Sequence, residues 1–262
     1  MTTDKELVQE YWDKEPADST GIASPEGSLQ FFEAMEERRY RDEAYIHSLA
    51  QFTRWRGKKV LEVGCGCGTD LLQFARAGAE VYGIDLSQHS VELTRKHLKL
   101  YGLQAEVNQG DGEDLPFTSK YFDLVYSWGV IHHAPHPSKV VAETYRVLKP
   151  GGYIKVMVYS RSSPVWLKMW FQHALLKGRV FTSLSRVISE HMESPGTKAF
   201  TMKETKRLFC QFRELEFRAF PRPELGFLGK YRALSWLVGL YPYRFASWMT
   251  VQGRKPNELN HR

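Results

Sequence analysis

The chain is 262 residues long, carries a net charge of +6 and has charged side chains at 25% of its positions. This length allows one large domain or two small ones, and the composition excludes an acidic disordered chain and an integral membrane protein. The charge is uneven, because residues 1–150 hold 17 basic and 23 acidic side chains whereas residues 151–262 hold 19 basic and 7 acidic ones. The second half also holds 18 of the 35 aromatic residues. A binding partner of this half would therefore meet a basic and aromatic surface.

Neither a disulfide framework nor a structural zinc site is expected, because Cys65, Cys67 and Cys210 form no CxxC pair and no even-numbered set. The N-terminal residues contain acids throughout and lack the apolar stretch of a signal peptide. The longest apolar stretch, residues 233–249, is interrupted by Pro242 and is shorter than the ~20 residues that a spanning helix requires. We therefore expect a cytoplasmic protein without a transmembrane segment.

In chain order, the sequence first predicts one or two amphipathic helices over residues 28–54, where apolar side chains recur every three or four positions. Strands and helices then alternate at short spacing. The predicted strands are 58–63, 80–85, 105–109, 122–128 and 153–159, and the predicted helices are 69–77, 90–101 and 137–148. This alternation is typical of an α/β fold with a parallel sheet and helices on both of its faces.

After residue 159 the alternation stops, and about forty mostly helical residues precede the next predicted elements. These are a helix over residues 202–212, a strand over 214–220 and a last strand over 247–252, which follows a second aromatic stretch. The sequence gives no internal repeat and few signs of a domain boundary, so we expect a single domain.

The most specific motif is a glycine loop that follows the first strand, with Gly64, Gly66 and Gly68 at alternate positions. Glycines let the chain turn tightly and let a ligand approach the backbone, and the helix that follows offers free N–H groups. Asp85 at the end of the next strand is placed to accept both hydroxyls of a ribose. The spacing is G-x-G-x-G after Glu62, and it matches neither the dinucleotide fingerprint nor a phosphate-binding P-loop.

Five segments extend this motif in a fixed order along the chain: LEVGCGCGT, YGIDLS, GDGEDLPF, FDLVYSWGVIHH and RVLKPGGYIKV. With them the chain resembles the class I S-adenosylmethionine-dependent methyltransferases, in the type 11 branch that acts on small molecules. The resemblance implies a Rossmann-like, mostly parallel, seven-stranded sheet with helices on both faces, in a single domain over residues 1–262. It divides this domain into an N-terminal helical cap (1–56), a cofactor-binding core (57–159), a substrate lid (160–200) and closing elements (201–262).

The resemblance also implies that the cofactor is S-adenosyl-L-methionine and that it touches residues of the first four motifs. The implied cofactor-binding residues are Glu62, Gly64, Cys65, Gly66, Gly68, Asp85, Leu86, Asp111, Gly112, Ser127 and Trp128. In this set Asp85 binds the ribose, Leu86 packs against the adenine and Asp111 accepts a hydrogen bond from the adenine amino group. Two alternatives stay open, because Glu62 can serve only the loop amides and Trp128 can belong to the hydrophobic core.

His132, His133 and His136 follow the fourth strand and allow three interpretations. A metal site is disfavoured, because their spacing does not match common ligand motifs and no carboxylate is adjacent. His132 or His133 could be a general base near the methyl group, or these residues could order the loop through hydrogen bonds. For Cys65 and Cys67 we expect small side chains between loop glycines and no thiol chemistry.

The basic and aromatic segment 160–200 lies where this family places its substrate lid. Its apolar residues include Trp166, Trp170, Phe171, Leu175 and Leu176, with Lys168, Lys177 and Arg179 among them. The segment could lie on an anionic membrane, line a pocket for an apolar or anionic acceptor, or form a core with a basic rim. No nucleic-acid partner is expected, because no recognition motif is present. We interpret the charge split as a division between an acidic donor side and a basic acceptor side.

Together these features predict an enzyme that transfers a methyl group from S-adenosylmethionine to oxygen or carbon of a small hydrophobic or anionic acceptor. The acceptor could be lipid-like, and the protein would be cytoplasmic, with peripheral membrane contact as an open alternative. Two other functions are considered, an NAD(P)-dependent oxidoreductase and a non-catalytic, cofactor-binding subunit at the membrane periphery. The oligomeric state is not predicted.

Overall fold

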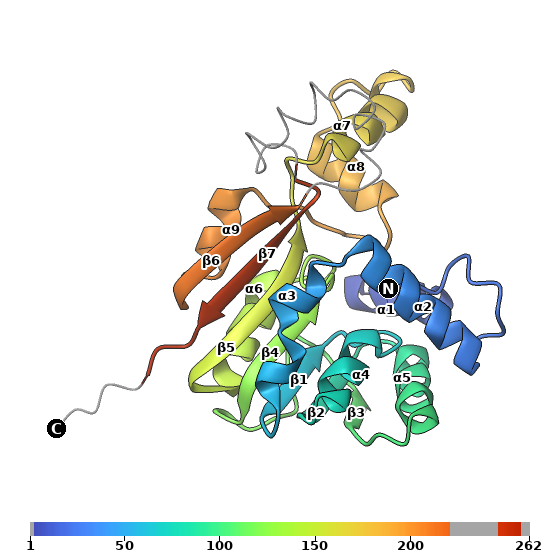
Figure 1. The fold of residues 1–262 in the computed structure, drawn as a ribbon. Coiled ribbons are helices and arrows are strands. Elements are labelled where there is room, and N and C mark those ends of the chain that lie inside the picture. Colours follow the sequence, from blue (N-terminus) through green and yellow to red (C-terminus); the bar gives the residue numbers. More distant parts are fainter. Residues whose placement is uncertain (1–2, 221–245, 258–262) are drawn as a thin grey trace, which may run out of the picture.

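The computed structural model describes residues 3–220 and 246–257 and shows one seven-stranded sheet (Figure 1). The strand order is β3-β2-β1-β4-β5-β7-β6, and β7 pairs antiparallel with both of its neighbours while the remaining pairs are parallel. The strands are β1 (Lys59–Val63), β2 (Glu80–Asp85), β3 (Glu106–Gln109), β4 (Phe122–Trp128), β5 (Leu148–Tyr159), β6 (Arg213–Phe220) and β7 (Trp248–Arg254). The predicted Rossmann-like fold class is thus confirmed. The second aromatic stretch, residues 221–245, lies outside the described residues.

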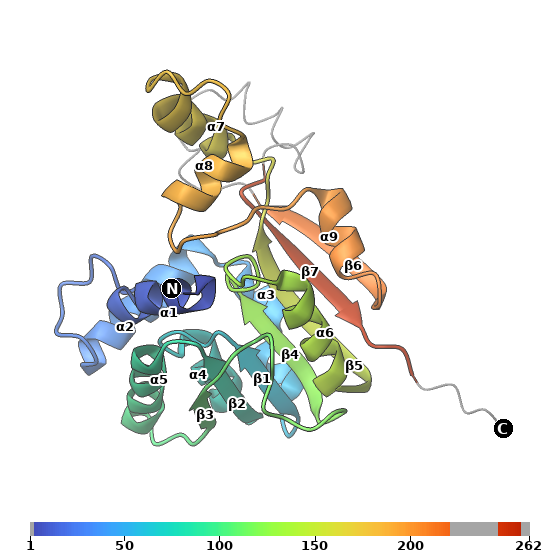
Figure 2. The same ribbon diagram turned by 180° about the vertical axis from the view of Figure 1, so that it is seen from behind.

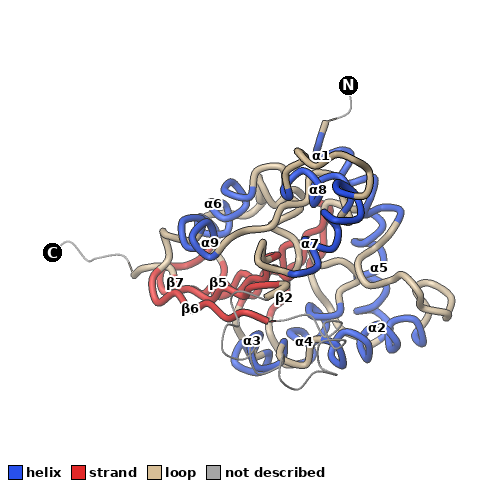
Figure 3. The backbone as a smooth tube through the Cα atoms, turned by 90° about the horizontal axis from the view of Figure 1, so that it is seen from above, coloured by secondary structure: helices blue, strands red, loops and turns tan. Residues whose placement is uncertain are grey.

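Helices cover both faces of the sheet, as the view from above shows (Figure 3). One face carries α3 (Ile46–Ala50), η1 (Phe52–Trp55), α4 (Thr69–Arg76) and α5 (Gln88–Leu100), and the other carries α6 (Pro137–Val147) and α9 (Met202–Leu208). The strands have apolar side chains on both faces for this reason. In β1, Val60 belongs to the first hydrophobic cluster, whereas Leu61 and Val63 belong to the second.

Two groups of helices lie outside this alternation at the carboxyl edge of the sheet. They are α1 (Asp4–Lys14) with α2 (Leu29–Asp42), and the segment formed by α7 (Pro164–Trp170), the π-helical turn η2 (Phe171–Leu175) and α8 (Leu184–His191). Figure 2 shows α7 and α8 projecting beyond the sheet, with α1 and α2 beside its carboxyl edge. No helix among residues 3–220 and 246–257 is long and apolar enough to cross a bilayer.

The structure corrects several predicted boundaries. Helix α1 lies within the expected N-terminal helical cap, for which no helix was assigned before residue 28, and it begins with a capping box in which Thr3 accepts from the backbone of Glu6. The region 28–54 contains three helices, because Glu43 leaves the helical conformation and Gln51 adopts a left-handed one. Strand β5 begins at Leu148, five residues earlier than predicted, and the predicted helix 202–212 ends at Leu208.

A buried ion pair fixes α2 to the rest of the fold. Arg39 of α2 donates to both carboxylate oxygens of Asp70 in α4, at 3.2 and 2.6 Å. The hydroxyls of Tyr40 and Tyr126 donate to the same carboxylate at 2.8 and 2.9 Å, and Asp70 is only 2% exposed. Burial alone would lower the pKa of Arg39, but the charges of Asp70 and Asp18 raise it above its usual value. The Asp70 carboxylate therefore joins α2, α4 and β4.

Replacing Asp70 with Asn is expected to destabilise the protein by about 3–5 kcal/mol, because the buried guanidinium of Arg39 loses its counter-charge. The matched control is Asp42→Asn, which breaks the exposed Arg41–Asp42 pair at the end of the same helix and should cost less than about 1 kcal/mol. Urea unfolding of both variants and the unchanged protein measures the difference. Similar small losses in both variants would show that the buried pair does not hold α2.

Candidate functional site

The glycine loop between β1 and α4 forms the floor of a cavity at the carboxyl edge of the sheet. Gly64, Gly66 and Gly68 all have positive φ angles, of 75°, 53° and 77°. Two of them also have no room for a side chain, because a Cβ would lie 2.3 Å from Val130 at Gly64 and 2.8 Å from Thr94 at Gly68. The alternating glycines are thus required by backbone conformation and by close packing.

We call the space above this loop the donor cavity; it measures about 120 Å³. Its walls come from the ends of β1, β2 and β4 and from α1, whose Lys5, Val8 and Trp12 cover it. The predicted cofactor-binding residues that line it are Gly64, Gly66, Asp85, Leu86, Asp111, Gly112 and Trp128. The sequence analysis gave no role to Lys5 or Val8, because nothing in the motifs shows that α1 folds back over the sheet edge.

Asp85 stands at the end of β2 with its carboxylate held by the backbone. The N–H of Gly66 donates to Oδ2 at 2.8 Å, and the N–H of Ser87 donates to Oδ1 at 2.9 Å. Burial raises the pKa of Asp85 to about 6, although these two hydrogen bonds oppose the shift. A carboxylate fixed in this way retains lone pairs for the hydroxyls of a ribose. The site therefore suits the adenosine portion of a nucleoside ligand.

Asp111 faces the opposite end of the donor cavity and contacts α1. Lys5 donates a short hydrogen bond to its Oδ2 and lies 3.4 Å from Glu113. The N–H of Glu113 also donates to Oδ1 of Asp111, at 2.8 Å. Adjacent Gly112 leaves the floor open, since a Cβ there would approach Val63 to 3.1 Å. The helix α1 is thus bound directly to the residue expected to recognise an adenine.

Four predicted cofactor-binding residues, Glu62, Cys65, Gly68 and Ser127, are not among those lining the donor cavity. Burial and the charge of Asp70 raise the pKa of Glu62 well above its usual value, and its Oε2 has no hydrogen-bond partner within the described part of the chain. The hydroxyl of Ser127 donates to the carbonyl of Val63 at 2.9 Å. The Cys65 thiol lies 3.7 Å from the Thr94 hydroxyl, and burial raises its pKa well above that of a free thiol. In this structure these four residues lie outside the lining of the donor cavity, and Ser127 bonds to the end of β1.

The three histidines after β4 point to three different environments. His132 is fully buried, packs on Tyr159 with ring centroids 3.8 Å apart, and neither ring nitrogen has a partner in the described residues. Burial lowers its pKa well below the usual value. His133 lines the donor cavity, whereas His136 is exposed and bonded to Glu113. Residues 3–220 and 246–257 contain no cluster of three or more metal-ligating side chains.

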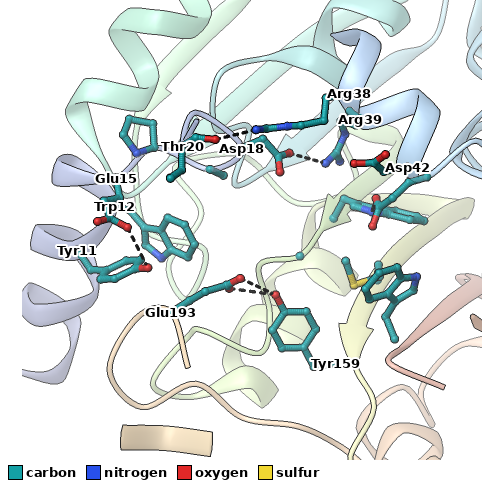
Figure 4. A pocket seen from close by; sticks show the side chains of 17 residues that line it. Tyr11, Trp12, Glu15, Asp18, Thr20, Arg38, Arg39, Asp42, Tyr159 and Glu193 are labelled. Carbon is teal, nitrogen blue, oxygen red and sulfur yellow. Dashed lines mark hydrogen bonds and ion pairs between the residues drawn. The ribbon is translucent and has the colours of Figure 1, made fainter. Parts of the chain in front are cut away.

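A larger cavity, which we call the acceptor cavity, lies beside the donor cavity and measures about 590 Å³ (Figure 4). The two cavities share four wall residues, Trp12, Ala17, Trp128 and Gly129. Figure 4 shows Tyr11 and Trp12 of α1 on one side, near Glu193, and Arg39 and Asp42 of α2 on the other. The charged residues of the wall are Glu15, Asp18, Arg38, Arg39, Asp42, Glu43 and Glu193. Five acids and two bases make this described wall acidic, which differs from the predicted basic acceptor side.

Glu193 connects the two cavities through hydrogen bonds. The Tyr159 hydroxyl lies 3.0 Å from both of its carboxylate oxygens, and Nε2 of His133 lies 3.2 Å from Oε2. Nδ1 of His133 contacts the hydroxyls of Ser194 and Thr197 at 2.9 and 3.0 Å. His133 lines the donor cavity and Glu193 the acceptor cavity, so the pair spans their junction. The sequence analysis missed Glu193, which lies in a loop after α8 without any motif.

At the other side of the acceptor cavity, Trp128 donates from Nε1 to Glu43 at 2.8 Å. Burial raises the pKa of Glu43, against the opposing effects of Arg39 and of this hydrogen bond. Nε1 of Trp248, which also lines the cavity, is buried and has no partner among the described residues. The wall thus combines indole rings with polar and charged side chains.

Comparison with known proteins places this site in a family. A model described as "Methyltransferase domain" matches residues 61–156. The chain is 38% identical over 131 residues to a fatty-acid O-methyltransferase from Mycolicibacterium smegmatis, covering 49% of this chain and 47% of that protein. It is 37% identical over 112 residues to a ubiquinone biosynthesis O-methyltransferase from Thiobacillus denitrificans, covering 42% and 48%. A phthiotriol/phenolphthiotriol dimycocerosates methyltransferase from Mycobacterium ulcerans matches at 38% over 110 residues, covering 41% and 40%. The matched regions thus span less than half the length of these relatives.

Solved structures show the same fold at low sequence identity. The Haloferax volcanii complex of the Trm112 methyltransferase activator with a methyltransferase gives a TM-score of 0.65 at 20% identity, covering 97% of this chain and 100% of the matched chain. The [4+2]-cyclase SpnF gives 0.55 at 17% identity, covering 97% and 93%, so this fold also occurs in a protein named for another reaction. The family model covers the glycine loop, Asp85, Asp111 and β4, which are the parts that build the donor cavity. The chain therefore contains a class I methyltransferase domain of the type 11 branch, the family whose cofactor is S-adenosylmethionine.

Proposed function

We propose that the protein transfers a methyl group from S-adenosylmethionine to an oxygen of a small, largely apolar acceptor. The observation that carries this proposal is the junction of the two cavities at Trp12, Ala17, Trp128 and Gly129. A methyl group passing between ligands in the two cavities would cross at this junction. Transfer to carbon uses the same geometry, and the named O-methyltransferases among the relatives favour oxygen.

In this proposal the donor cavity binds the cofactor through residues on three strand ends. Asp85 accepts from the ribose hydroxyls, Asp111 accepts from the adenine amino group, and Gly64 and Gly66 let the methionine portion approach the backbone. The residues fit this ligand, because the Asp85 carboxylate is already fixed by two backbone N–H groups. Bound here, the cofactor supplies an activated methyl group, so the protein has mainly to align the acceptor and exclude water.

The acceptor cavity indicates a neutral, apolar acceptor with at least one hydroxyl. Its wall contains the rings of Trp12, Trp128, Tyr159 and Trp248, which suit an apolar body. The surplus of carboxylates in the described wall disfavours an anionic acceptor, because like charges repel at short range. The relatives named above are named for fatty acids, ubiquinone and dimycocerosates, which supports a lipid-like acceptor.

An acceptor hydroxyl must lose its proton as it gains the methyl group. The His133–Glu193 pair is placed to take that proton, because it spans the junction and Tyr159 orients its carboxylate. His132 is buried away from both cavities, so among the two predicted bases only His133 is given this role. Proton transfer of this kind typically contributes a factor of about 10²–10⁴ to the rate.

The proposed activity is tested by incubating the protein with S-adenosylmethionine labelled in its methyl group and with a panel of quinols, long-chain alcohols and cell extract. Mass spectrometry should find a labelled product, and S-adenosylmethionine but not NAD should bind in calorimetry. Binding of NAD alone would support the oxidoreductase alternative. Cofactor binding without any labelled product would support a non-catalytic subunit.

Asp85→Asn is expected to weaken binding of S-adenosylmethionine about tenfold or more, because two charge-assisted hydrogen bonds are lost. Affinity of the unchanged protein should also fall as the pH drops through about 6, since a protonated Asp85 must release its proton to accept from the ribose. The variant should lack this dependence. Calorimetric titration between about pH 5 and 8 measures both effects. Asp114→Asn, an exposed acid on the same edge, is the control, and equal effects in both variants would contradict the role of Asp85.

Glu193→Gln is expected to lower kcat by about 10²-fold or more without weakening cofactor binding, because it removes the proton acceptor from the acceptor side only. Labelled product per unit time and calorimetric affinity measure the two quantities. The control is Glu190→Gln, which lies on α8 and breaks only an exposed pair with Arg186. An unchanged kcat, or a loss that tracks cofactor affinity, would contradict a role in proton transfer.

A further inference from the structure

The segment of residues 164–191, which we call the helical insertion, exposes an unusual number of large apolar side chains. In the described residues nine large apolar side chains are exposed, and six of them fall within 15 positions of this segment. These six are Leu167, Phe171, Leu175, Leu176, Val180 and Phe181, with Phe181 fully exposed and Leu176 68% exposed. Clustered exposed apolar groups indicate an interaction site, whereas isolated ones need no explanation.

These side chains are not needed for the internal packing of the helical insertion. Its inner face is formed by a separate cluster of Trp166, Ile188 and Ala199, which are at most 4% exposed. The indole of Trp170 is also satisfied, because Nε1 donates to the carbonyl of Thr182 at 2.7 Å. The predicted apolar surface therefore divides into an inner part around Trp166 and an outer part. Leu167, Phe171 and Leu175 recur every four residues and so share the outer side of α7 and η2.

The charges of the helical insertion complement an anionic surface. Lys168, Lys177, Arg179 and Arg186 lie within it, and its one acid, Glu190, is paired with Arg186 at 2.7 Å. A cavity of about 300 Å³ opens beside the exposed residues, with Arg179, Thr182, Arg186, Glu190 and the stacked rings of His173 and His191 in its wall. Nδ1 of His173 is buried there without a partner in the described chain. Cations and hydrogen-bond donors around a hollow suit a phosphate headgroup.

We propose that the helical insertion docks on the surface of an anionic lipid bilayer. The apolar residues 167–181 enter the boundary between headgroups and acyl chains, and the surrounding cations contact lipid phosphates. A second copy of this chain fits less well, because two such surfaces would bring their cations together. The helical insertion begins five residues after Tyr159 and ends two residues before Glu193, and both of these residues line the acceptor cavity. Docking would thus place the acceptor cavity next to the lipid phase. The role of this cavity rests on the proposed function, whereas the docking itself does not depend on it.

Flotation with lipid vesicles tests the docking, using the full chain and two vesicle compositions. The protein should float with phosphatidylcholine vesicles that contain phosphatidylglycerol, and much less with phosphatidylcholine alone. The variant Leu176→Ser with Phe181→Ser should reduce binding about tenfold or more, because two exposed apolar side chains no longer enter the bilayer. Lys177→Ala with Arg179→Ala should reduce it about 25-fold, at about fivefold for each cation. Both pairs are exposed, so folding should be preserved, as circular dichroism can verify.

The matched control is Leu100→Ser with Lys99→Ala, an exposed apolar and basic pair at the end of α5. It should bind vesicles like the unchanged protein. The proposal would be overturned if the unchanged protein bound neither vesicle type. It would also be overturned if the control variant lost as much vesicle binding as the variants in the helical insertion. Sedimentation velocity distinguishes the competing occupant, since a dimer that Phe181→Ser dissociates would show that this surface joins two copies. Cofactor affinity is measured in parallel and should not change in any of these variants, so failure of docking and failure of methyl transfer remain distinguishable.

Discussion

The buried charge of Asp70 is the constraint on which the acceptor side of the molecule depends. A carboxylate at 2% exposure needs hydrogen-bond donors and a counter-charge, and Arg39, Tyr40 and Tyr126 supply them from two other elements. Since Arg39 and Tyr40 belong to α2, the same bonds fix the helix that carries part of the acceptor wall. Burial raises the pKa of neighbouring Glu62, and the charge of Asp70 raises it further while Arg39 opposes the shift. One buried ion pair thereby couples the cap to the sheet.

The donor side was predictable because its geometry restricts which residues can occupy it. Gly64 and Gly68 need positive φ angles and lie against neighbours that leave no room for a Cβ. The backbone conformation therefore requires glycine at these two positions. Asp85 is likewise fixed by its place at the end of β2. The motif nevertheless contains residues of two kinds. Glu62 and Ser127 belong to the same motifs as Gly64 and Trp128, but in this structure they do not line the donor cavity, and Ser127 bonds to the backbone of β1. Linear spacing does not separate a ligand contact from a structural support.

The acceptor side was not predictable in the same way, because its wall is assembled from segments that are distant in the chain. The folded chain brings together Trp12, Glu43, Glu193 and Trp248 from four separate segments at the edge of the sheet. None of them lies in a motif, since an aromatic wall can be built from many residues at many positions. The bounds and position of α1 within the expected helical cap were not predictable for the same reason. Its one buried residue, Val8, gives a weak apolar pattern, and its position depends on contacts such as Lys5 with Asp111.

The uneven charge of the chain takes a different meaning in the structure. The described acceptor wall holds acids from both halves of the sequence, such as Asp18 and Glu193, so the basic half does not simply form a basic acceptor site. The cations of the helical insertion are instead exposed, as with Lys168 and Arg179, and they accompany exposed apolar side chains. Acids therefore predominate in the wall of the acceptor cavity, whereas cations predominate on the outer surface of the helical insertion. An acidic, aromatic interior suits a neutral acceptor, and a basic, apolar exterior suits an anionic lipid surface, so both properties fit an acceptor that reaches the enzyme from a membrane.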